Sequence, residues 1–451
     1  MLLRIFDDLD TARQTILCRR PTAAASLPPE VRESLRRALG ADLEPEEAVA
    51  AIIAAVRTEG DRALARFCAA FDGRVPESWE VPPAELDRAL ASLPASTRAA
   101  LELAAHRIRR FHERALPRSW IEPDSGGTFG QLFRPIERVG VYAPGGRAAY
   151  PSTVLMTVIP ARVAGVEQIV LCTPDGVRGS PEPTVLAAAR VAGVDRVFRV
   201  GGAQAIAALA FGTDSIPRVD KIVGPGNLFV ALAKKQVYGT VGIDQIAGPT
   251  ETVIIADASA SPTALAADLL AQAEHDPLAT AILLTDARAV AEATACEVER
   301  QITTLPRREI IRRSLESTGG AVIVPTIESA IELANAFAPE HLCLAIRDPW
   351  AYVPQVKHAG GIFLGERSAE AIGDYTAGPS HVMPTGGTAR FASPLGVHDF
   401  LKISSIFDIS PTLFEQLGPP AALLARAEGL DAHAAAVHLR QDDPHRQGEI
   451  G

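Results

Sequence analysis

The chain has 451 residues, of which 47% are hydrophobic and 22% charged, and its formal net charge is −10. This balance is typical of a globular protein with a large buried core and roughly two to four domains. An acidic chain without clustered excess lysine and arginine is not expected to bind nucleic acid.

The cysteines and the N-terminus indicate where the chain works. Its five cysteines are scattered and form no Cys-x-x-Cys pair, which favours buried thiols over a disulfide framework. The start, MLLRIFDDLD, lacks the basic residues and long apolar core of a signal peptide. No apolar run approaches the ~20 residues that a membrane helix needs. We therefore expect a cytoplasmic protein that is not attached to a membrane.

The first part of the chain has a helical pattern. Residues 1–27 are expected to form an N-terminal arm, and the region from there to about Leu116 is predicted to be helical. Ala95–Ala115 carries apolar residues at helical spacing. His106 and His112 lie in this helix, and we assign them no role because single helical histidines are usually core or surface residues.

From Arg138 the pattern changes to short β-branched runs that alternate with helices, which indicates β-α-β units and parallel sheets. The expected fold class is α/β, with two doubly wound, Rossmann-like parallel-sheet domains. One domain is expected to combine residues 28–138 with 250–387, and the other to span 139–249. The expected strands are Val139–Tyr142, Gln168–Cys172, Arg196–Val200, Lys221–Val223, Thr252–Ile255, Ala281–Leu284, Ala321–Val324, His341–Ile346 and Gly361–Leu364.

The last part of the chain shows no further strand signal after Gly387. Residues 388–451 are rich in alanine and leucine and include helix-forming stretches such as Ala421–Ala427. They are predicted to form a small helical tail.

Three glycine-containing loops follow strands of the 139–249 domain, where parallel sheets bind their ligands. They are Val141–Ser152, Val200–Ala205 and Val223–Asn227. Backbone N–H groups at the following helix starts could face a pyrophosphate. The G-x-G-x-x-G fingerprint is absent, and glycine turns are ordinary in α/β proteins, so nucleotide binding and a purely structural role both remain open. The polar side chains best placed to contact a cofactor are Tyr142, Gln204 and Asn227.

The turn Asn335–Leu342 (NAFAPEHL) is the first candidate for the chemistry. The helix-like run Ile327–Phe337 stops at Pro339, because proline lacks an N–H group and crowds the preceding turn. Glu340 and His341 then stand side by side where a strand begins. A carboxylate beside an imidazole suits a reaction with more than one proton transfer. The alternative is a solvated surface turn.

A second candidate is the sequence AQAEHDP at the end of a helix that starts near Pro262. Gln272 and His275 are three residues apart and share one helical face. Both can ligate a metal ion. Glutamine is an unusual zinc ligand, however, and a polar helix end that stops at Pro277 is the alternative.

The polar loop Gly373–Gly387 is the third candidate and offers Asp374 and His381. It could be a connector, although long loops inside compact domains usually have a function. In the tail, Glu428 and His433 lie close in sequence, and a solvated C-terminal helix explains them equally well. Spacing alone does not show that the possible metal ligands of these segments meet.

Taken together, these stretches resemble the histidinol dehydrogenase family from about residue 28 to residue 440. The matching strings, in chain order, are VGVYAPGG, VGGAQAIAALAFGT, KIVGPGN, AGPTE, AQAEHDP, FAPEHL, GDYTAGPSHVMPTGGTARF, DFLK and AEGLDAH. Nine strings in one order make the resemblance highly specific.

The resemblance implies a homodimeric enzyme with one zinc ion per subunit. Such an enzyme oxidises L-histidinol to L-histidine through L-histidinal, in two NAD-dependent steps of histidine biosynthesis. Glu340 and His341 would be the acid–base pair. Zinc would be held by Gln272, His275, Asp374 and His433, the last supplied by the partner subunit. NAD would lie against Tyr142, Gln204 and Asn227. Substrate contacts would be Thr250, Gln272, His275, His341, Asp374, Glu428 and His433.

These roles are chemically consistent with one another. Hydride transfer requires a fixed carbinol carbon and a group such as His341 that takes the alcohol proton. Glu340 could then activate the water that the aldehyde step needs, while zinc orients the substrate. Thr250 stands where many relatives have serine, and Ser380 where asparagine is common. A family member acting on another small amino or sulfonated alcohol, a zinc hydrolase and a non-catalytic metal-binding protein are the alternatives.

Overall fold

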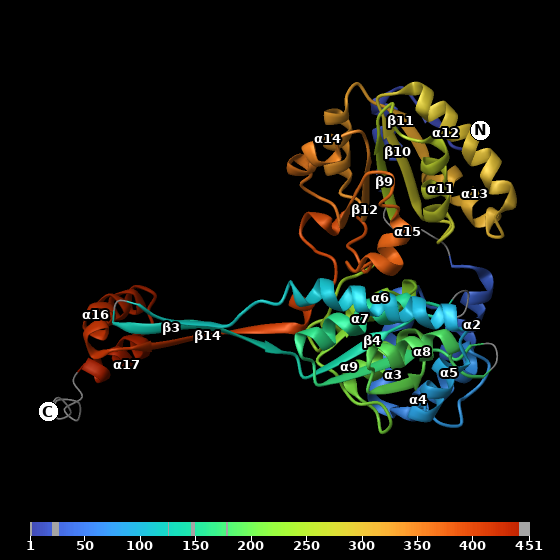
Figure 1. Cartoon of the computed structure of the whole chain (residues 1–451). Helices are drawn as coiled ribbons and strands as arrows, with labels where there is room; N and C mark the ends of the chain where they lie inside the picture. Colours follow the sequence, from blue (N-terminus) through green and yellow to red (C-terminus); the bar gives the residue numbers. More distant parts are fainter. Residues whose placement is uncertain (1, 20–26, 125, 146–148, 177–178, 442–451) are drawn as a thin grey trace. The chain divides into compact units, whose positions relative to one another are not determined.

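The computed structural model describes residues 2–19, 27–124, 126–145, 149–176 and 179–441. The chain divides into two compact units (Figure 1). The first comprises Met1–Leu116 and Ile136–Phe400, and the second comprises Pro117–Pro135 and Leu401–Gly451.

The first unit contains a five-stranded parallel sheet with the order β6-β5-β4-β7-β8. Successive strands run outward from β4 in both directions, so the order reverses at this strand. In doubly wound sheets, such a reversal opens a crevice at the carboxyl ends of the strands. The strands are β4 (Arg138–Tyr142), β5 (Gln168–Thr173), β6 (Arg196–Arg199), β7 (Lys221–Val223) and β8 (Gly242–Ile243).

Helices cover this sheet, and one hydrophobic core joins its strands to N-terminal helices. Phe67 of α4 and Phe198 of β6 are both fully buried in that core, together with residues of α3 and α9. The limits expected for the two domains stay a prediction, and this packing favours grouping α3 and α4 with the five-stranded sheet. The helices from α2 to α10 are α2 (Pro29–Leu39), α3 (Pro45–Glu59), α4 (Asp61–Phe71), α5 (Pro83–Ser92), α6 (Ala95–Glu113), α7 (Pro151–Ala164), α8 (Pro183–Ala192), α9 (Gly202–Phe211) and α10 (Leu228–Val237).

The first unit also contains a six-stranded parallel sheet with the order β1-β11-β10-β9-β12-β13. Hydrophobic clusters pack on both of its faces. Its strands are β1 (Ile5–Phe6), β9 (Glu251–Ala256), β10 (Thr280–Thr285), β11 (Gly320–Ile323), β12 (His341–Ala345) and β13 (Gly361–Leu364). Its helices are α11 (Pro262–Ala273), α12 (Arg288–Gln301), α13 (Arg308–Thr318), α14 (Ile327–Phe337) and the short α15 (Glu370–Ile372).

The start of the chain is part of this second sheet. Strand β1 pairs with β11 in parallel register, and α1 (Leu9–Gln14) follows it. Leu3 is fully buried in the core. The N-terminal segment therefore contributes a strand and buried side chains to this sheet, and the limits expected for the arm stay a prediction.

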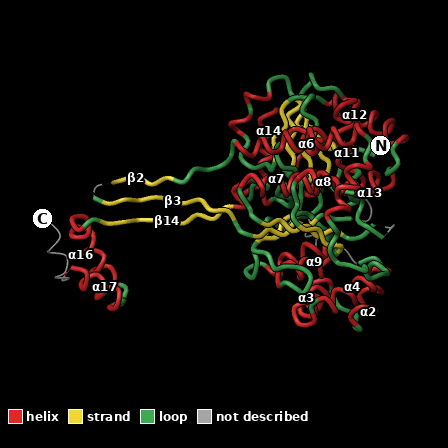
Figure 2. Tube along the Cα trace, turned by 60° about the horizontal axis from the view of Figure 1, so that its bottom comes forward, coloured by secondary structure: helices red, strands yellow, loops and turns green. Residues whose placement is uncertain are grey.

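The second unit is built on a three-stranded antiparallel sheet with the order β14-β3-β2, and α16 and α17 lie at one end of these strands (Figure 2). The helical tail is confirmed, but the expectation of no strand after Gly387 was wrong. Strand β14 spans nine residues, and all of them are exposed or half-buried. The elements of the second unit are β2 (Trp120–Asp124), β3 (Gly127–Pro135), β14 (Leu401–Ile409), α16 (Pro411–Ala427) and α17 (Asp431–Gln441).

The fold class is α/β with two doubly wound parallel sheets, as predicted. In the described part of the chain, no helix combines the length and the apolar character needed to cross a membrane.

Candidate active site

The turn between α14 and β12 buries the two proton carriers. Ala338 ends the helix with a φ of 53°, which makes it the one non-glycine residue with positive φ among the described residues. Pro339 follows and prevents the helix from continuing. Glu340 is only 6% exposed and His341 only 3%. The alternative of a solvated surface turn is therefore excluded.

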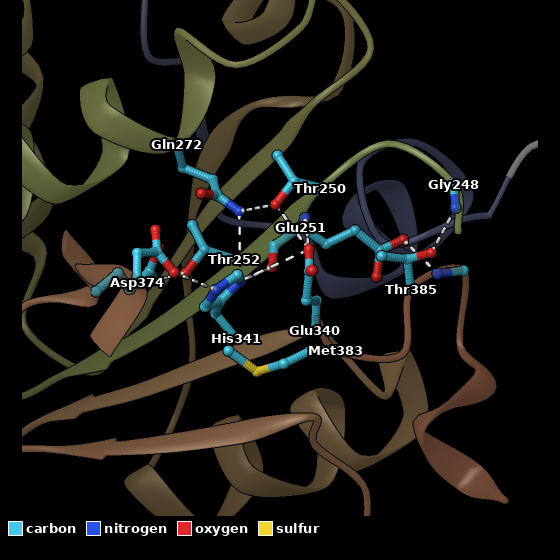
Figure 3. Close-up of polar contacts among 12 residues, drawn as sticks. Gly248, Thr250, Glu251, Thr252, Gln272, Glu340, His341, Asp374, Met383 and Thr385 are labelled. Carbon is cyan, nitrogen blue, oxygen red and sulfur yellow. Dashed lines mark hydrogen bonds and ion pairs between the residues drawn. The ribbon is translucent and has the colours of Figure 1, made fainter. Parts of the chain in front are cut away.

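This pair lies at the amino end of β12. His341 is the first residue of the strand and pairs with Thr252 of β9 and Gly361 of β13. Thr250 immediately precedes β9, and Gln272 lies in the last turn of α11, which leads toward β10. Side chains from three separate segments of the chain thus gather at the amino ends of the neighbouring strands β9 and β12 (Figure 3).

Short hydrogen bonds orient the Glu340 carboxylate. Its Oε2 accepts a hydrogen bond of 2.6 Å from Thr250 Oγ1 and one of 3.1 Å from the backbone N–H of Glu251. Gln272 Nε2 donates to the same Thr250 hydroxyl at 2.6 Å. The hydroxyl therefore connects the amide of α11 to the carboxylate of the turn.

The ring of His341 is held by its Nδ1 atom. Nδ1 lies 3.1 Å from the backbone oxygen of Glu251, so this nitrogen carries a proton and donates it there. The same atom is 3.6 Å from Glu340 Oε2. On the other side of the ring, Nε2 is 3.7 Å from Asp374 Oδ1 and has no hydrogen-bond partner within the described part of the chain. Nε2 is thus the atom left to exchange a proton with a substrate.

Burial and neighbouring charges tune these groups. Burial raises the pKa of Glu340 to about 7, against the opposing effects of His341 and Thr250. Burial lowers the pKa of His341, but the charges of Glu370, Glu340 and Asp374 outweigh it and raise the pKa to about 10. A carboxyl group with a pKa near neutrality can both take and return a proton.

Glu370 is a further buried carboxylate whose charge acts on His341, and the sequence did not predict it. It is 4% exposed and accepts hydrogen bonds from Thr252 Oγ1 and, at 3.0 Å, from Cys343 Sγ. Thr252 and Cys343 are on neighbouring strands, and Glu370 begins the short helix α15. No local pattern distinguishes Glu370 from the exposed acidic residues of the chain.

The possible metal ligands are only partly brought together. Gln272 is buried beside His341, with Nε2 3.5 Å from Nδ1 of that ring. Asp374 lies in a π-helical turn (Gly373–Ala377). Burial raises the pKa of Asp374, but the interaction with His341 at 3.7 Å and the charges of His341, His381 and His275 lower it overall. His275 is therefore within electrostatic reach of Asp374, although its side chain is exposed.

The remaining predicted residues of this site lie in the second unit. Glu428 is the C-cap of α16, and His433 lies on α17; both are exposed. Among the described residues, no three His, Cys, Asp or Glu side chains group closely enough to hold a metal ion. The meeting of His433 with Gln272, His275 and Asp374 stays a prediction.

The predicted cofactor residues lie at the ends of strands or the starts of helices around the five-stranded sheet: Tyr142 is the last residue of β4, Gln204 lies in α9, and Asn227 is the N-cap of α10. The Tyr142 hydroxyl accepts a 3.1 Å hydrogen bond from the N–H of Gly202, at the start of α9. Gln204 is buried in the first turn of that helix. Asn227 caps α10 through a 3.2 Å hydrogen bond from Val230 N–H. Residues 146–148 of the first glycine loop lie outside the described residues.

Gly224 shows how closely the β4 and β7 loops approach each other. Its φ is 113°, and a Cβ atom there would lie 2.2 Å from the backbone oxygen of Tyr142. Only glycine fits this position. The convergence point coincides with the reversal of strand order at β4, the usual ligand crevice of such sheets.

The site combines a buried carboxylate–imidazole pair at the amino end of a strand with a second doubly wound sheet. This is the arrangement of an α/β enzyme that moves protons. The family model described as histidinol dehydrogenase matches residues 35–441. The chain belongs to the histidinol dehydrogenase family and is an oxidoreductase.

Relatives of known sequence and structure agree with this assignment. The histidinol dehydrogenase of a Synechococcus species is 52% identical over 399 residues, covering 88% of this chain and 92% of that protein. The Thermus thermophilus histidinol dehydrogenase is 53% identical over 406 residues, covering 90% and 97%. The crystal structure of histidinol dehydrogenase from Elizabethkingia anophelis superposes with a TM-score of 0.89 at 34% identity, covering 97% of this chain and 98% of that one.

Proposed function

We propose that the protein oxidises L-histidinol to L-histidine in histidine biosynthesis, through L-histidinal, and that each of the two steps reduces one NAD. The relatives named histidinol dehydrogenase support the substrate. The observation that carries the chemistry is the buried pair Glu340 and His341, whose Nδ1-to-Oε2 distance is 3.6 Å and whose Nε2 atom is unpartnered.

In the first step, neutral His341 takes the alcohol proton at Nε2 while the carbinol carbon passes a hydride to the nicotinamide. The products are the aldehyde, NADH and one proton. The bond from Nδ1 to the Glu251 oxygen keeps the ring oriented and leaves Nε2 as the proton-accepting atom. Fixed reactants remove much of the entropic barrier to this transfer.

In the second step, Glu340 takes a proton from the water that adds to the aldehyde carbon. The resulting hydrate anion passes a hydride to a second NAD and becomes the carboxylic acid, which loses its remaining proton to solvent and leaves as the carboxylate. The step therefore yields the carboxylate, NADH and two protons, one of them taken by Glu340. The two hydrogen bonds from Thr250 and Glu251 hold Oε2 in place for this role. Burial supports it too, because it raises the pKa of Glu340 to about 7.

NAD is proposed to lie at the carboxyl end of β4 against Tyr142, Gln204 and Asn227. The glycine turns there can bring backbone N–H groups to a pyrophosphate. The start of α9 contacts the end of β4 through the hydrogen bond from Gly202 N–H to the Tyr142 hydroxyl, and α10 follows β7, the neighbour of β4, which supports the placement.

Zinc is proposed to be held by Gln272, His275, Asp374 and His433 of the partner subunit. A mixed set of nitrogen and oxygen atoms fits zinc, and Asp374 Oδ1 lies 3.7 Å from His341 Nε2, which has no hydrogen-bond partner among the described residues. A bound zinc ion would supply a template for the substrate's imidazole and amine, and its positive charge would favour neutral His341. Glu428 would contact the same end of the substrate. This arrangement requires a homodimer.

The first experiment tests the substrate and the cofactors. Purified protein with NAD and L-histidinol should produce NADH, whereas an amino alcohol without the imidazole ring should not. A chelator should abolish turnover, and added Zn²⁺ should restore it. Turnover that persists unchanged after measured removal of all metal would contradict the zinc proposal, and absence of NADH from the metal-loaded protein would contradict the substrate.

A second experiment tests the shared site. Chains carrying His433→Ala and chains carrying His341→Ala are mixed under conditions that exchange subunits. If the tail supplies His433 across the dimer, one of the two sites in a mixed dimer is intact and activity returns in part. Confirmed mixed dimers without activity would exclude this arrangement.

A further inference from the structure

Arg19 contacts both chain segments that hold the acid–base pair. Its guanidinium forms an ion pair with Glu251, in which Nη1 faces Oε1 and Nη2 lies 2.9 Å from Oε2. The same group donates from Nε to the backbone oxygen of Phe337 at 3.0 Å and from Nη2 to that of Ala338 at 3.1 Å. One side chain thus connects the start of β9 to the end of α14.

The chemistry of these contacts requires arginine. The last carbonyl groups of a helix have no partner within the helix, and a planar guanidinium can reach two of them while it still binds a carboxylate with both Nη atoms. Its Cζ atom also lies 4.0 Å from the centroid of the Phe337 ring. A lysine ammonium, as a single point charge, cannot make all of these contacts together.

Glu251 passes this restraint to the reacting groups through its backbone. Its N–H donates to Glu340 Oε2 at 3.1 Å, and its oxygen accepts from His341 Nδ1 at 3.1 Å. Its side chain is 9% exposed and also accepts a 3.2 Å hydrogen bond from Gly386 N–H. A shift of this residue would therefore move both members of the acid–base pair.

We propose that Arg19 is a positioning residue for the reaction. By binding both Glu251 and the turn after α14, it holds the side chains of Glu340 and His341 in the positions that the reaction needs. This inference rests on the proposed roles of that pair. It assigns a catalytic consequence to the N-terminal segment, 232 residues away in sequence from Glu251.

Arg390 provides a matched control, because it caps the same helix without touching Glu251. Its Nη2 donates to the backbone oxygens of Asn335 at 3.2 Å and Ala336 at 2.6 Å. Loss of Arg390 removes hydrogen bonds from the end of α14 but leaves the ion pair of Glu251 intact. The pair of variants therefore separates helix capping from positioning.

The test compares Arg19→Ala, Arg19→Lys and Arg390→Ala in steady-state histidinol oxidation, with zinc and NAD saturating. For both Arg19 variants we expect kcat to fall about tenfold to a hundredfold, with KM changing less than about threefold, because misplaced reacting groups slow the chemistry. Arg390→Ala should keep kcat within about threefold while its thermal midpoint falls. The double variant Arg19→Ala with Glu251→Gln should lose little beyond the single Arg19 variant, because the two residues act as one unit.

A kcat of Arg19→Ala within threefold of the wild type, alongside a lowered thermal midpoint, would overturn the proposal and leave Arg19 as a helix cap. If Arg19→Ala does not fold, Arg19→Lys decides: a folded lysine variant with unchanged kcat overturns it equally. If the wild type itself does not oxidise histidinol, the proposed function fails first. Loss of L-histidinal oxidation in Glu340→Gln with full activity in both Arg19 variants would refute the positioning role alone.

Discussion

The Glu340→Gln variant tests the acid–base assignment in the greatest detail. Glutamine keeps the shape of the side chain and an oxygen that can accept from Thr250, but it cannot take a proton from water. General-base catalysis of this kind contributes about a hundredfold to ten-thousandfold in rate. Oxidation of L-histidinal should therefore slow by that factor, or about 2.7–5.4 kcal/mol of transition-state stabilisation. Oxidation of L-histidinol to the aldehyde should slow much less, so the variant should release aldehyde.

The pH profile gives a second, independent magnitude. Burial raises the pKa of Glu340 to about 7, so the rate of the aldehyde step should rise as the carboxylate forms. The ionised fraction is about one-tenth at pH 6 and about nine-tenths at pH 8, which predicts a rise of roughly tenfold in the wild type and a flat profile in the variant.

The assay is the initial rate of NADH formation with L-histidinal as the added substrate. Glu332→Gln, the same charge change on an exposed residue of α14, is the control and should match the wild type. A Glu340→Gln variant that oxidises the aldehyde within about threefold of the wild-type rate would refute the assigned role.

Three further perturbations test other parts of the structure. Thr250→Val removes the hydroxyl that donates to the Glu340 carboxylate at 2.6 Å and should lower kcat about tenfold. Thr250→Ser should keep most activity, and equal kcat values in the two variants would contradict this role of the hydroxyl. Lys234→Met leaves Asp244 buried without its ion-pair partner and should lower the free energy of unfolding, measured in urea, by about 3–5 kcal/mol. The control Lys235→Met, at an exposed position, should lower it by less than about 0.5 kcal/mol, and similar losses in the two variants would contradict the buried pair. Burial lowers the pKa of His112 to about 4, so as pH falls the unfolded chain takes up a proton at this residue before the folded chain does. The stability that depends on neutral His112, about 3 kcal/mol, is therefore present above pH 6.5 and lost as pH falls through 4. His112→Leu should therefore unfold less steeply between pH 6.5 and 4 in acid titrations, and an unchanged acid transition would show that the histidine is not buried as a neutral ring.

Local sequence rules were sufficient for nine strands of the two parallel sheets and for the reactive turn. Strands with buried β-branched residues, such as β9 and β10, carry a dense apolar signal that predicts them directly. Pro339 after a helical run predicted the turn, because its effect on the backbone depends only on its neighbours in sequence.

Other features depend on tertiary contacts or on the absence of a buried face. Strand β14 is exposed or half-buried along its whole length, so it shows no apolar period that could reveal it. Glu370 and Arg19 act through partners that are far away in sequence, at separations of 118 and 232 residues from Thr252 and Glu251. No short pattern around either residue contains that information.

The most direct test of the central claim is the number of NADH molecules formed per L-histidinol consumed by the wild-type enzyme. If Glu340 and His341 serve two successive oxidations in one site, the ratio is two and free aldehyde does not accumulate. A ratio of one, with the aldehyde released in equal amount, would contradict the account.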